Sequence, residues 1–170
     1  SEYSDIGFIL LGLALEQIAG ESLDRVCPRR IFAPLGMTST CFRPPSGWKS
    51  AIAPTEEDLV FRSRVLQGEV QDENAWVMGG VAGHAGVFSN VPDVLRFADA
   101  VLQAHAGNTT KYNLFETAAV EVFGERQGPA DSSRALGWET PSANSSSGRY
   151  FSPHSIGHLE YSGCSLWIDR

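Results

Sequence analysis

The sequence has few cysteines, and their spacing excludes a framework built on them. Cys27, Cys41 and Cys164 are odd in number and far apart, so they form neither a metal-ligand motif nor a set of structural disulfides. Cys27 and Cys164 lie among apolar residues, and we expect both to be small core side chains. The cysteines therefore leave the redox compartment open.

Basic residues are also scarce. The 170 residues contain 13 Lys and Arg against 20 Asp and Glu, which gives a formal net charge of -7. Binding of phosphate backbones needs clustered positive charge, so the composition argues against a nucleic-acid partner. The adjacent pair Arg29-Arg30 is expected on the solvated face of a helix.

Long apolar runs are absent as well. The strongest, residues 8–15, is closed by Glu16 and is far shorter than the ~20 residues that a membrane-spanning helix needs. No charged n-region of a signal peptide precedes it. With 42% hydrophobic and 19% charged residues, the chain fits a globular protein, and we expect a buried helix here.

A first helix is expected from Ile6 to about Ala19. Ser4 or Asp5 can cap its N-terminus, and Gly20 can end it. Apolar residues cover nearly its whole circumference, which is typical of a helix at the centre of a domain.

Further helices are expected along the chain. Ser22 begins a second one, which Pro28 kinks or delays because a mid-helix proline costs about 3 kcal/mol. The clearest amphipathic helix follows Ser89 or Asn90 and has Pro92 in its first turn. Its apolar stripe consists of Val94, Leu95, Ala98, Val101 and Leu102. A short helix is expected over residues 114–123.

The rest of the chain indicates loops and strands. Residues 41–58 are mostly loop, and short strand-like pieces lie around Gly68-Glu-Val. Residues 134–139 could form a short strand, and 142–148 form a surface loop. Residues 156–169 predict two strands or one bent strand. Helices first and strands last favour an α+β fold with segregated elements.

Tyr3-Ser4-Asp5 is the first candidate site. A phenol and a carboxylate at a helix N-terminus suit proton handling, because the helix dipole favours negative charge there. The alternative is structural: Ser4 and Asp5 act only as caps, and Tyr3 packs against the helix.

The second candidate is the glycine-rich segment 79–86, which contains His84. Glycines allow close approach of the backbone to a ligand. No lysine follows in the phosphate-loop position, so nucleotide binding is disfavoured and a loop lining a pocket is favoured. His84 is either functional or a hydrogen-bonded structural residue.

Two other patterns carry less weight. His154 and His158 have a spacing that suits a metal on a helix, but Pro153 and Gly157 exclude a helix there, so we expect neither a metal site nor a cofactor. Ser46-Gly-Trp-Lys49 matches the Ser-x-x-Lys nucleophile pattern, which needs the lysine one helical turn after the serine. Prolines and Gly47 place it in a loop, so we interpret it as a chance match.

Taken together, the motifs resemble serine hydrolases of the β-lactamase and penicillin-binding-protein superfamily, with class C β-lactamases as the type. The segments that carry the resemblance are Tyr3-Ser-Asp-Ile-Gly7, Ile31-Phe-Ala-Pro-Leu-Gly-Met-Thr38, Gly68-Glu-Val-Gln-Asp-Glu-Asn-Ala75, Gly79-Gly-Val-Ala-Gly-His-Ala-Gly-Val-Phe-Ser89, Ala135-Leu-Gly-Trp138 and Gly157 through Asp169. An esterase or β-lactamase-like subgroup shares several of them.

The resemblance implies a fold and a mechanism. It implies a β-lactamase/transpeptidase-like fold and hydrolysis of an ester or amide, in a small molecule or peptide, through an acyl-enzyme. Tyr3 would relay protons, and Asp5 stands where many relatives have Asn. His158 stands at the Lys or His of the third motif. Tyr161 follows that motif, and its backbone N–H would be half of the oxyanion hole.

Two departures from the family pattern qualify this expectation. The Ser-x-x-Lys motif of the family precedes the tyrosine motif, so residues 1–170 are expected to be a partial domain without the nucleophile region and without the C-terminal strands and helix. The third motif, usually His-Thr-Gly in the subgroup, reads His158-Leu159-Glu160. Glu160 adds bulk and charge where substrate would lie.

Three hypotheses follow. The first is a segment of a serine hydrolase, inactive alone. The second is a non-catalytic binding or regulatory relative of the same fold. The third is a free-standing helical interaction module. Relatives are often exported to the periplasm, but these residues do not indicate a compartment.

Overall fold

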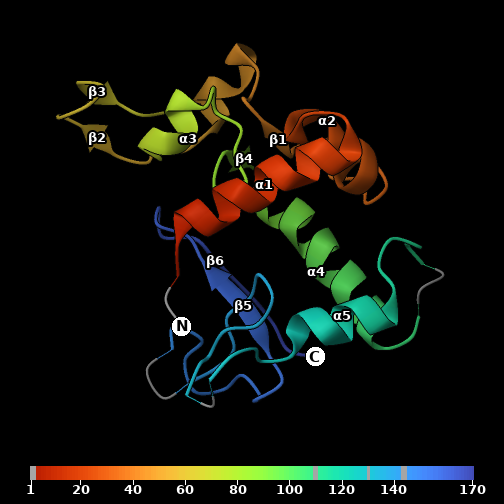
Figure 1. The fold of residues 1–170 in the computed structure, drawn as a ribbon. Helices are drawn as coiled ribbons and strands as arrows, with labels where there is room; N and C mark the ends of the chain where they lie inside the picture. Colours follow the sequence, from red (N-terminus) through yellow and green to blue (C-terminus); the bar gives the residue numbers. More distant parts are fainter. Residues whose placement is uncertain (1–2, 109–110, 130, 143–144) are drawn as a thin grey trace. The chain divides into compact units, whose positions relative to one another are not determined.

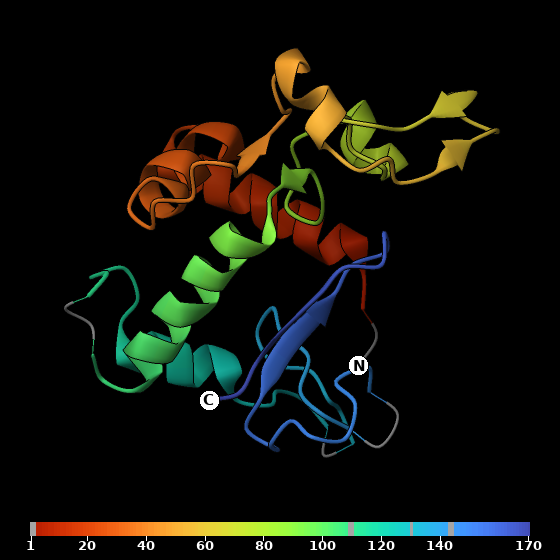
Figure 2. The same cartoon turned by 180° about the vertical axis from the view of Figure 1, so that it is seen from behind.

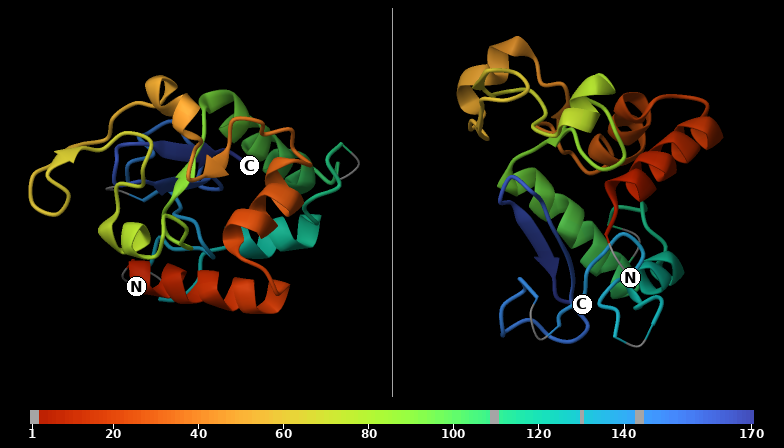
Figure 3. Two further views of the ribbon diagram at one scale, coloured as in Figure 1. Left: turned by 90° about the horizontal axis from the view of Figure 1, so that it is seen from above. Right: turned by 60° about the vertical axis from the view of Figure 1, so that its left-hand side comes forward.

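The computed structural model describes residues 3–108, 111–129, 131–142 and 145–170. The chain divides into two compact units, residues 3–94 and residues 95–170, and the boundary falls within helix α4 (Val91–His105). Figure 1 labels the elements, and Figures 2 and 3 show them from other sides. Both units combine helices with short antiparallel strands, which confirms the α+β class.

Helix α1 (Asp5–Ala19) begins one residue before the predicted start and ends at the predicted residue. Ser4 occupies the N-cap position in extended conformation, although its side chain makes no capping hydrogen bond. Gly20 ends the helix with a φ of 69°, a left-handed conformation that glycine adopts without strain, and its N–H donates to the Glu16 carbonyl at 2.8 Å.

The predicted burial of α1 is wrong for this structure. Gly12 is the buried residue of the helix, whereas large apolar side chains on several sides are exposed. They are Ile6, Leu10, Leu11, Leu13, Leu15 and Ile18. Within its unit, α1 is covered by helix α2 (Leu23–Cys27) and by the glycine-rich segment, which meets it at Gly12. The apolar side chains on all sides of α1 therefore present more surface than α2 and the glycine-rich segment cover.

The second helix changes its form at Pro28. Helix α2 continues as a π-helical segment, η1 (Pro28–Phe32), whose first residue is the proline. Proline cannot supply the N–H for a regular ladder, so the predicted interruption is confirmed. Arg29 is exposed and forms an ion pair with Glu21, which confirms the predicted solvated face.

Short strands and turns complete the first unit. Strand β1 (Cys41–Phe42) pairs antiparallel with β4 (Val87–Phe88), and β2 (Glu57–Asp58) pairs with β3 (Arg64–Val65). Along the chain, a 3-10 helix, η2 (Ser46–Ala51), lies between β1 and β2, and helix α3 (Glu73–Val77) lies between β3 and β4. The predicted strand around Gly68 is wrong, because Gly68 turns the chain with a φ of 74°.

Asn90 caps helix α4, as predicted. Its side-chain oxygen accepts a hydrogen bond from the Asp93 N–H at 2.9 Å. The buried Asp93 carboxylate in turn accepts from the Ser39 N–H at 2.7 Å and from the Thr40 hydroxyl at 2.9 Å. The start of α4 is thereby fixed to the segment that enters β1.

The second unit encloses one apolar cluster. Its buried members are Ala98, Val101, Ala104, Val120, Ile156 and Ile168. They come from α4, from helix α5 (Thr117–Gly124) and from the antiparallel hairpin of β5 (Ile156–Leu159) and β6 (Ser165–Ile168). The predicted pair of C-terminal strands is therefore confirmed. Cys164 is exposed before β6, so its predicted core position is wrong, and Cys27 is half-buried.

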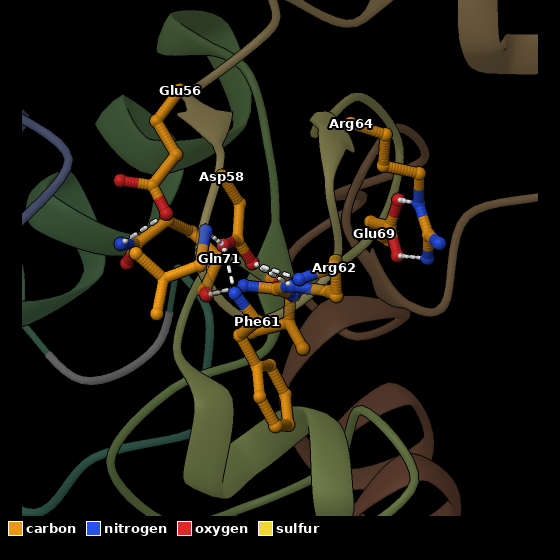
Figure 4. Close-up of polar contacts among 9 residues, drawn as sticks. Glu56, Asp58, Phe61, Arg62, Arg64, Glu69 and Gln71 are labelled. Atoms are coloured by element: carbon orange, nitrogen blue, oxygen red, sulfur yellow. Dashed lines mark hydrogen bonds and ion pairs between the residues drawn. The ribbon is translucent and has the colours of Figure 1, made fainter.

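A buried ion pair organises the β2–β3 hairpin (Figure 4). The Arg62 Nε donates to the Asp58 Oδ2 at 2.7 Å, and both side chains are at most 5% exposed. Arg62 also donates to the Val70 carbonyl at 2.7 Å and lies over the Trp76 ring. The hydrogen bond from Arg62, together with the Phe61 N–H, lowers the pKa of Asp58 to about 2.

Replacement of Arg62 tests this network. We expect Arg62→Met to lower the free energy of unfolding by about 3–5 kcal/mol, because it leaves a buried carboxylate without its cation. Urea unfolding measures the change. Arg64→Met is the matched control: Arg64 pairs with Glu69 at the surface, so its loss should change stability little. Equal effects of the two substitutions would show that burial of Arg62 does not matter.

Candidate active site

The end of α1 presents the first two predicted site residues. Tyr3 is 39% exposed, and its ring centroid lies 5.5 Å from that of Phe8, one turn into the helix. Asp5 is the first helical residue and is half-buried. The partial positive charge of the helix N-terminus stabilises a carboxylate at that position. Tyr3 and Asp5 thus lie together at one end of α1.

The glycine-rich segment joins α3 to β4 and packs directly on α1. A Cβ on Gly12 would lie 2.9 Å from the Cα of Gly83, and a Cβ on Gly83 would collide with the Phe8 carbonyl oxygen. Neither position therefore accepts a side chain without movement of backbone. The contact places the segment against the middle of the helix that begins at Asp5, two residues after Tyr3.

A pocket of about 300 Å³ lies beside this segment. Gly79 and Gly80 line it, with φ values of 85° and 81° that only glycine adopts readily. Arg43, Glu69 and the Trp76 ring contribute to the same wall. This agrees with the predicted role of the segment as the lining of a pocket.

His84 is hydrogen-bonded, one of the two predicted alternatives, but the sequence did not predict its partner, Asp72. Its Nε2 lies 2.8 Å from the Asp72 Oδ1, and the His84 side chain is 2% exposed. Asp72 also caps α3, since its carboxylate accepts from the Ala75 N–H at 2.7 Å. Burial alone would raise the pKa of Asp72, but the hydrogen bonds from Ala75 and His84 outweigh it and lower that pKa. In the sequence, the position of Asp72 just before Glu73-Asn-Ala could have indicated a helix N-cap.

Ser46 and Lys49 lie in the 3-10 helix η2, so their predicted loop position is wrong. Side chains three residues apart in a 3-10 helix lie on one face, which brings the two near each other. Both are exposed, and among the described contacts no hydrogen bond joins the serine hydroxyl to the lysine. The pattern has a helical form here but lacks the interaction that activates a serine.

The remaining predicted residues lie at the turn end of the β5–β6 hairpin. His158 on β5 is half-buried and faces Leu166 in the register. Burial lowers its pKa, Arg134 acts in the same direction, and Glu139 and Glu160 oppose them.

The turn after β5 carries Glu160 and Tyr161. Glu160 accepts a hydrogen bond from the Ser162 hydroxyl, and its own N–H donates to the Cys164 carbonyl at 2.9 Å. Tyr161 is 89% exposed. The side chain that departs from the family pattern is therefore held in a tight turn.

The predicted site residues fall into two groups. Tyr3 and Asp5 belong to the unit of residues 3–94, and His158, Glu160 and Tyr161 belong to the unit of residues 95–170. Their catalytic roles stay predictions. The described residues contain no cluster of three or more His, Cys, Asp or Glu suited to a metal.

Among the described residues, no single helix is long and apolar enough to cross a membrane. Only taken together do α1 and the segment Leu23–Phe32, with a bend of 68° between them, have the length and composition of a span.

Comparison with known proteins shows similarity over the whole chain. The family model described as Beta-lactamase matches residues 1–170. A protein of Escherichia coli K12 named "Putative D-alanyl-D-alanine carboxypeptidase" is 35% identical over 98% of this chain. The chain spans 42% of that relative's length.

Solved structures share the fold at low sequence identity. A β-lactamase from Mycobacterium bovis has a TM-score of 0.66 at 20% identity, with 98% of this chain and 51% of that chain covered. The hydrolase EstCE1, described as having promiscuous acyltransferase activity, has a TM-score of 0.68 at 19% identity, with 98% and 47% covered. These likenesses establish the architecture alone.

The lowered pKa of His158 can be measured by NMR. We expect its imidazole to titrate below the ordinary value of 6.5, because burial disfavours the charged form. The unfolded chain then binds more protons than the folded chain just below pH 6.5, so the free energy of unfolding falls as the pH drops below 6.5.

Arg134→Gln should raise the midpoint of His158, since the arginine charge lowers it. His158→Gln assigns the resonance. A midpoint above 6.5, or one indifferent to Arg134, would contradict the described surroundings of His158.

Proposed function

The chain belongs to the β-lactamase family, and from this membership we propose that it supplies part of the active site of a serine hydrolase. The reaction is hydrolysis of an ester or amide in a small molecule or peptide. A serine hydroxyl attacks the carbonyl carbon, the bond to the leaving group breaks as that group takes up a proton, and water then hydrolyses the acyl-enzyme. The observation that carries the proposal is the family match over residues 1–170.

Tyr3 and Asp5 are proposed to serve the proton transfers. The exposed phenol at the start of α1 is accessible to a reacting group, and its ring contact with Phe8 restrains its orientation. A phenol can both donate and accept a proton. Asp5 adds negative charge beside it, where an ionised carboxylate accepts hydrogen bonds but cannot donate one.

His158 and Tyr161 are proposed to hold the substrate. A half-buried imidazole with a lowered pKa is neutral near pH 7, so His158 would act through hydrogen bonds rather than through a fixed positive charge. The backbone N–H of Tyr161 would contribute to an oxyanion hole. Glu160, at the start of the same turn, would favour substrates that bring a positive charge or a hydrogen-bond donor.

We propose that the nucleophile lies outside these 170 residues. The chain spans 42% of a curated relative, which leaves ample sequence to provide a Ser-x-x-Lys motif. Ser46 and Lys49 are exposed on η2 and are not joined by a described hydrogen bond, which supports excluding them. The 170-residue chain alone would then have little or no hydrolase activity.

A non-catalytic binding relative is the second candidate. Its support is the sequence His158-Leu159-Glu160, in which Leu159 is 46% exposed and Glu160 carries a charge beside it. Exposed apolar and acidic side chains in this place suit binding of a ligand without turnover. A Ser-x-x-Lys at a helix start in the longer parent sequence would favour the enzyme, and its absence would favour the binding protein.

An ester-hydrolysis assay tests the proposal. We expect the 170-residue chain to hydrolyse p-nitrophenyl acetate no faster than an equal concentration of Ser46→Ala. Both rates should match that of an unrelated protein without hydrolase activity at the same concentration. Loss of activity specific to Ser46→Ala would place the nucleophile at Ser46. Activity that survives in Ser46→Ala but is lost in Tyr3→Phe would place the nucleophile elsewhere within these residues.

A further inference from the structure

The buried His84 has one nitrogen without a partner. Its Nε2 bonds to Asp72, but the Nδ1 is buried and no group of the described residues hydrogen-bonds to it. The ring is 2% exposed, so bulk water does not satisfy this atom. Buried polar atoms are almost always paired, because a lost hydrogen bond to water is otherwise not replaced.

We infer that the Asp72–His84 pair is an oriented acceptor site, in which the Nδ1 of His84 binds one small O–H donor, a water molecule in the uncomplexed chain. The inference does not rest on the proposed hydrolase chemistry. It concerns a site within residues 70–86, apart from the predicted residues Tyr3, Asp5, His158 and Tyr161.

Asp72 determines which nitrogen of His84 carries the proton. Its carboxylate accepts from the Ala75 N–H, and a lowered pKa keeps it ionised at neutral pH. An ionised carboxylate can only accept, so the Nε2 that faces it must be the protonated nitrogen. In the neutral imidazole this leaves the lone pair on Nδ1, which fixes Nδ1 as an acceptor.

The surroundings favour a small donor. The apolar residues Val70, Ala75 and Ala82 form a buried cluster with Ala85 packed against it, and Gly83 is in contact with the backbone of α1. Because these neighbours are packed closely, a group that binds the Nδ1 must be compact. A carboxylate at 2.8 Å also compensates the charge that would form if His84 took up the donor's proton, the arrangement that orients histidine bases in enzymes.

Long-range ¹H–¹⁵N NMR of the labelled 170-residue chain reads the tautomer directly. We expect His84 to be a single Nε2–H tautomer near pH 7, with an unprotonated Nδ1 and a cross peak between its Hε1 and a long-lived water. His84→Gln assigns the signals. An Nδ1–H tautomer, an average of both tautomers, or a ring without bound water would overturn the inference.

Three variants separate the two nitrogens. Asp72→Asn keeps the oxygen that caps α3 but can also donate, so we expect the single tautomer to become a mixture. His84→Asn keeps a polar group near the Nδ1 position and loses the bond to Asp72. His84→Gln keeps a donor near the Nε2 position and loses the Nδ1 acceptor.

If the Nδ1 site is real, both position-84 variants lower the melting temperature. If only the bond to Asp72 matters, His84→Gln retains the wild-type melting temperature and the acceptor site is refuted. An unfolded variant is recognised by its amide spectrum, and the tautomer of the wild-type chain then decides alone.

Discussion

The contact between the backbones of Gly12 and Gly83 is the constraint on which the unit of residues 3–94 depends. It joins the middle of α1 to the glycine-rich segment at a distance that excludes a Cβ on either side. The same helix begins at Asp5, two residues after Tyr3, and the same segment carries His84 and borders the pocket. Two glycines therefore determine how closely the predicted catalytic helix and the pocket wall approach each other.

Two buried polar pairs of the same unit are held by further hydrogen bonds. Arg62 with Asp58 and His84 with Asp72 each combine a side-chain bond with a bond to backbone, the carbonyl of Val70 in one case and the N–H of Ala75 in the other. Buried charge is costly unless it is paired in this way. The loops between α3, β3 and β4 thereby acquire a defined conformation despite their short strands.

Much of the secondary structure followed from local rules in the sequence. Gly20 ended α1, Pro28 interrupted the second helix, Asn90 capped α4, and the alternating C-terminal residues formed a hairpin, because each depends on neighbours within a few positions. The burial of side chains was predicted less well from the sequence. Cys164 and the apolar face of α1 are exposed, since burial depends on which distant segments cover a surface and not on the residue's own character.

The candidate site was predictable in part. Residue types and local patterns placed Tyr3 and Asp5 near a helix start and His158 on a strand, and the structure has them there. Their catalytic roles stay predictions. The partner of His84 was not predictable, because Asp72 lies twelve residues away across a helix and a turn. The helical form of the Ser46 segment was missed for another reason: its prolines precede the 3-10 helix, and Gly47 is tolerated within it.

A pair of glycine substitutions in α1 tests most directly whether the Gly12–Gly83 contact organises this unit. Gly7 and Gly12 share the helix, but a Cβ on Gly7 meets nothing within 4 Å, whereas one on Gly12 lies 2.9 Å from the Gly83 backbone. Alanine gains about 1 kcal/mol over glycine in a helix interior and less in the first turn, where Gly7 lies. Thermal unfolding followed by circular dichroism should therefore show a melting temperature for Gly7→Ala equal to or slightly above that of the original chain. We expect Gly12→Ala to lower it. A Gly12→Ala chain stabilised as much as Gly7→Ala would contradict a structural role for the contact.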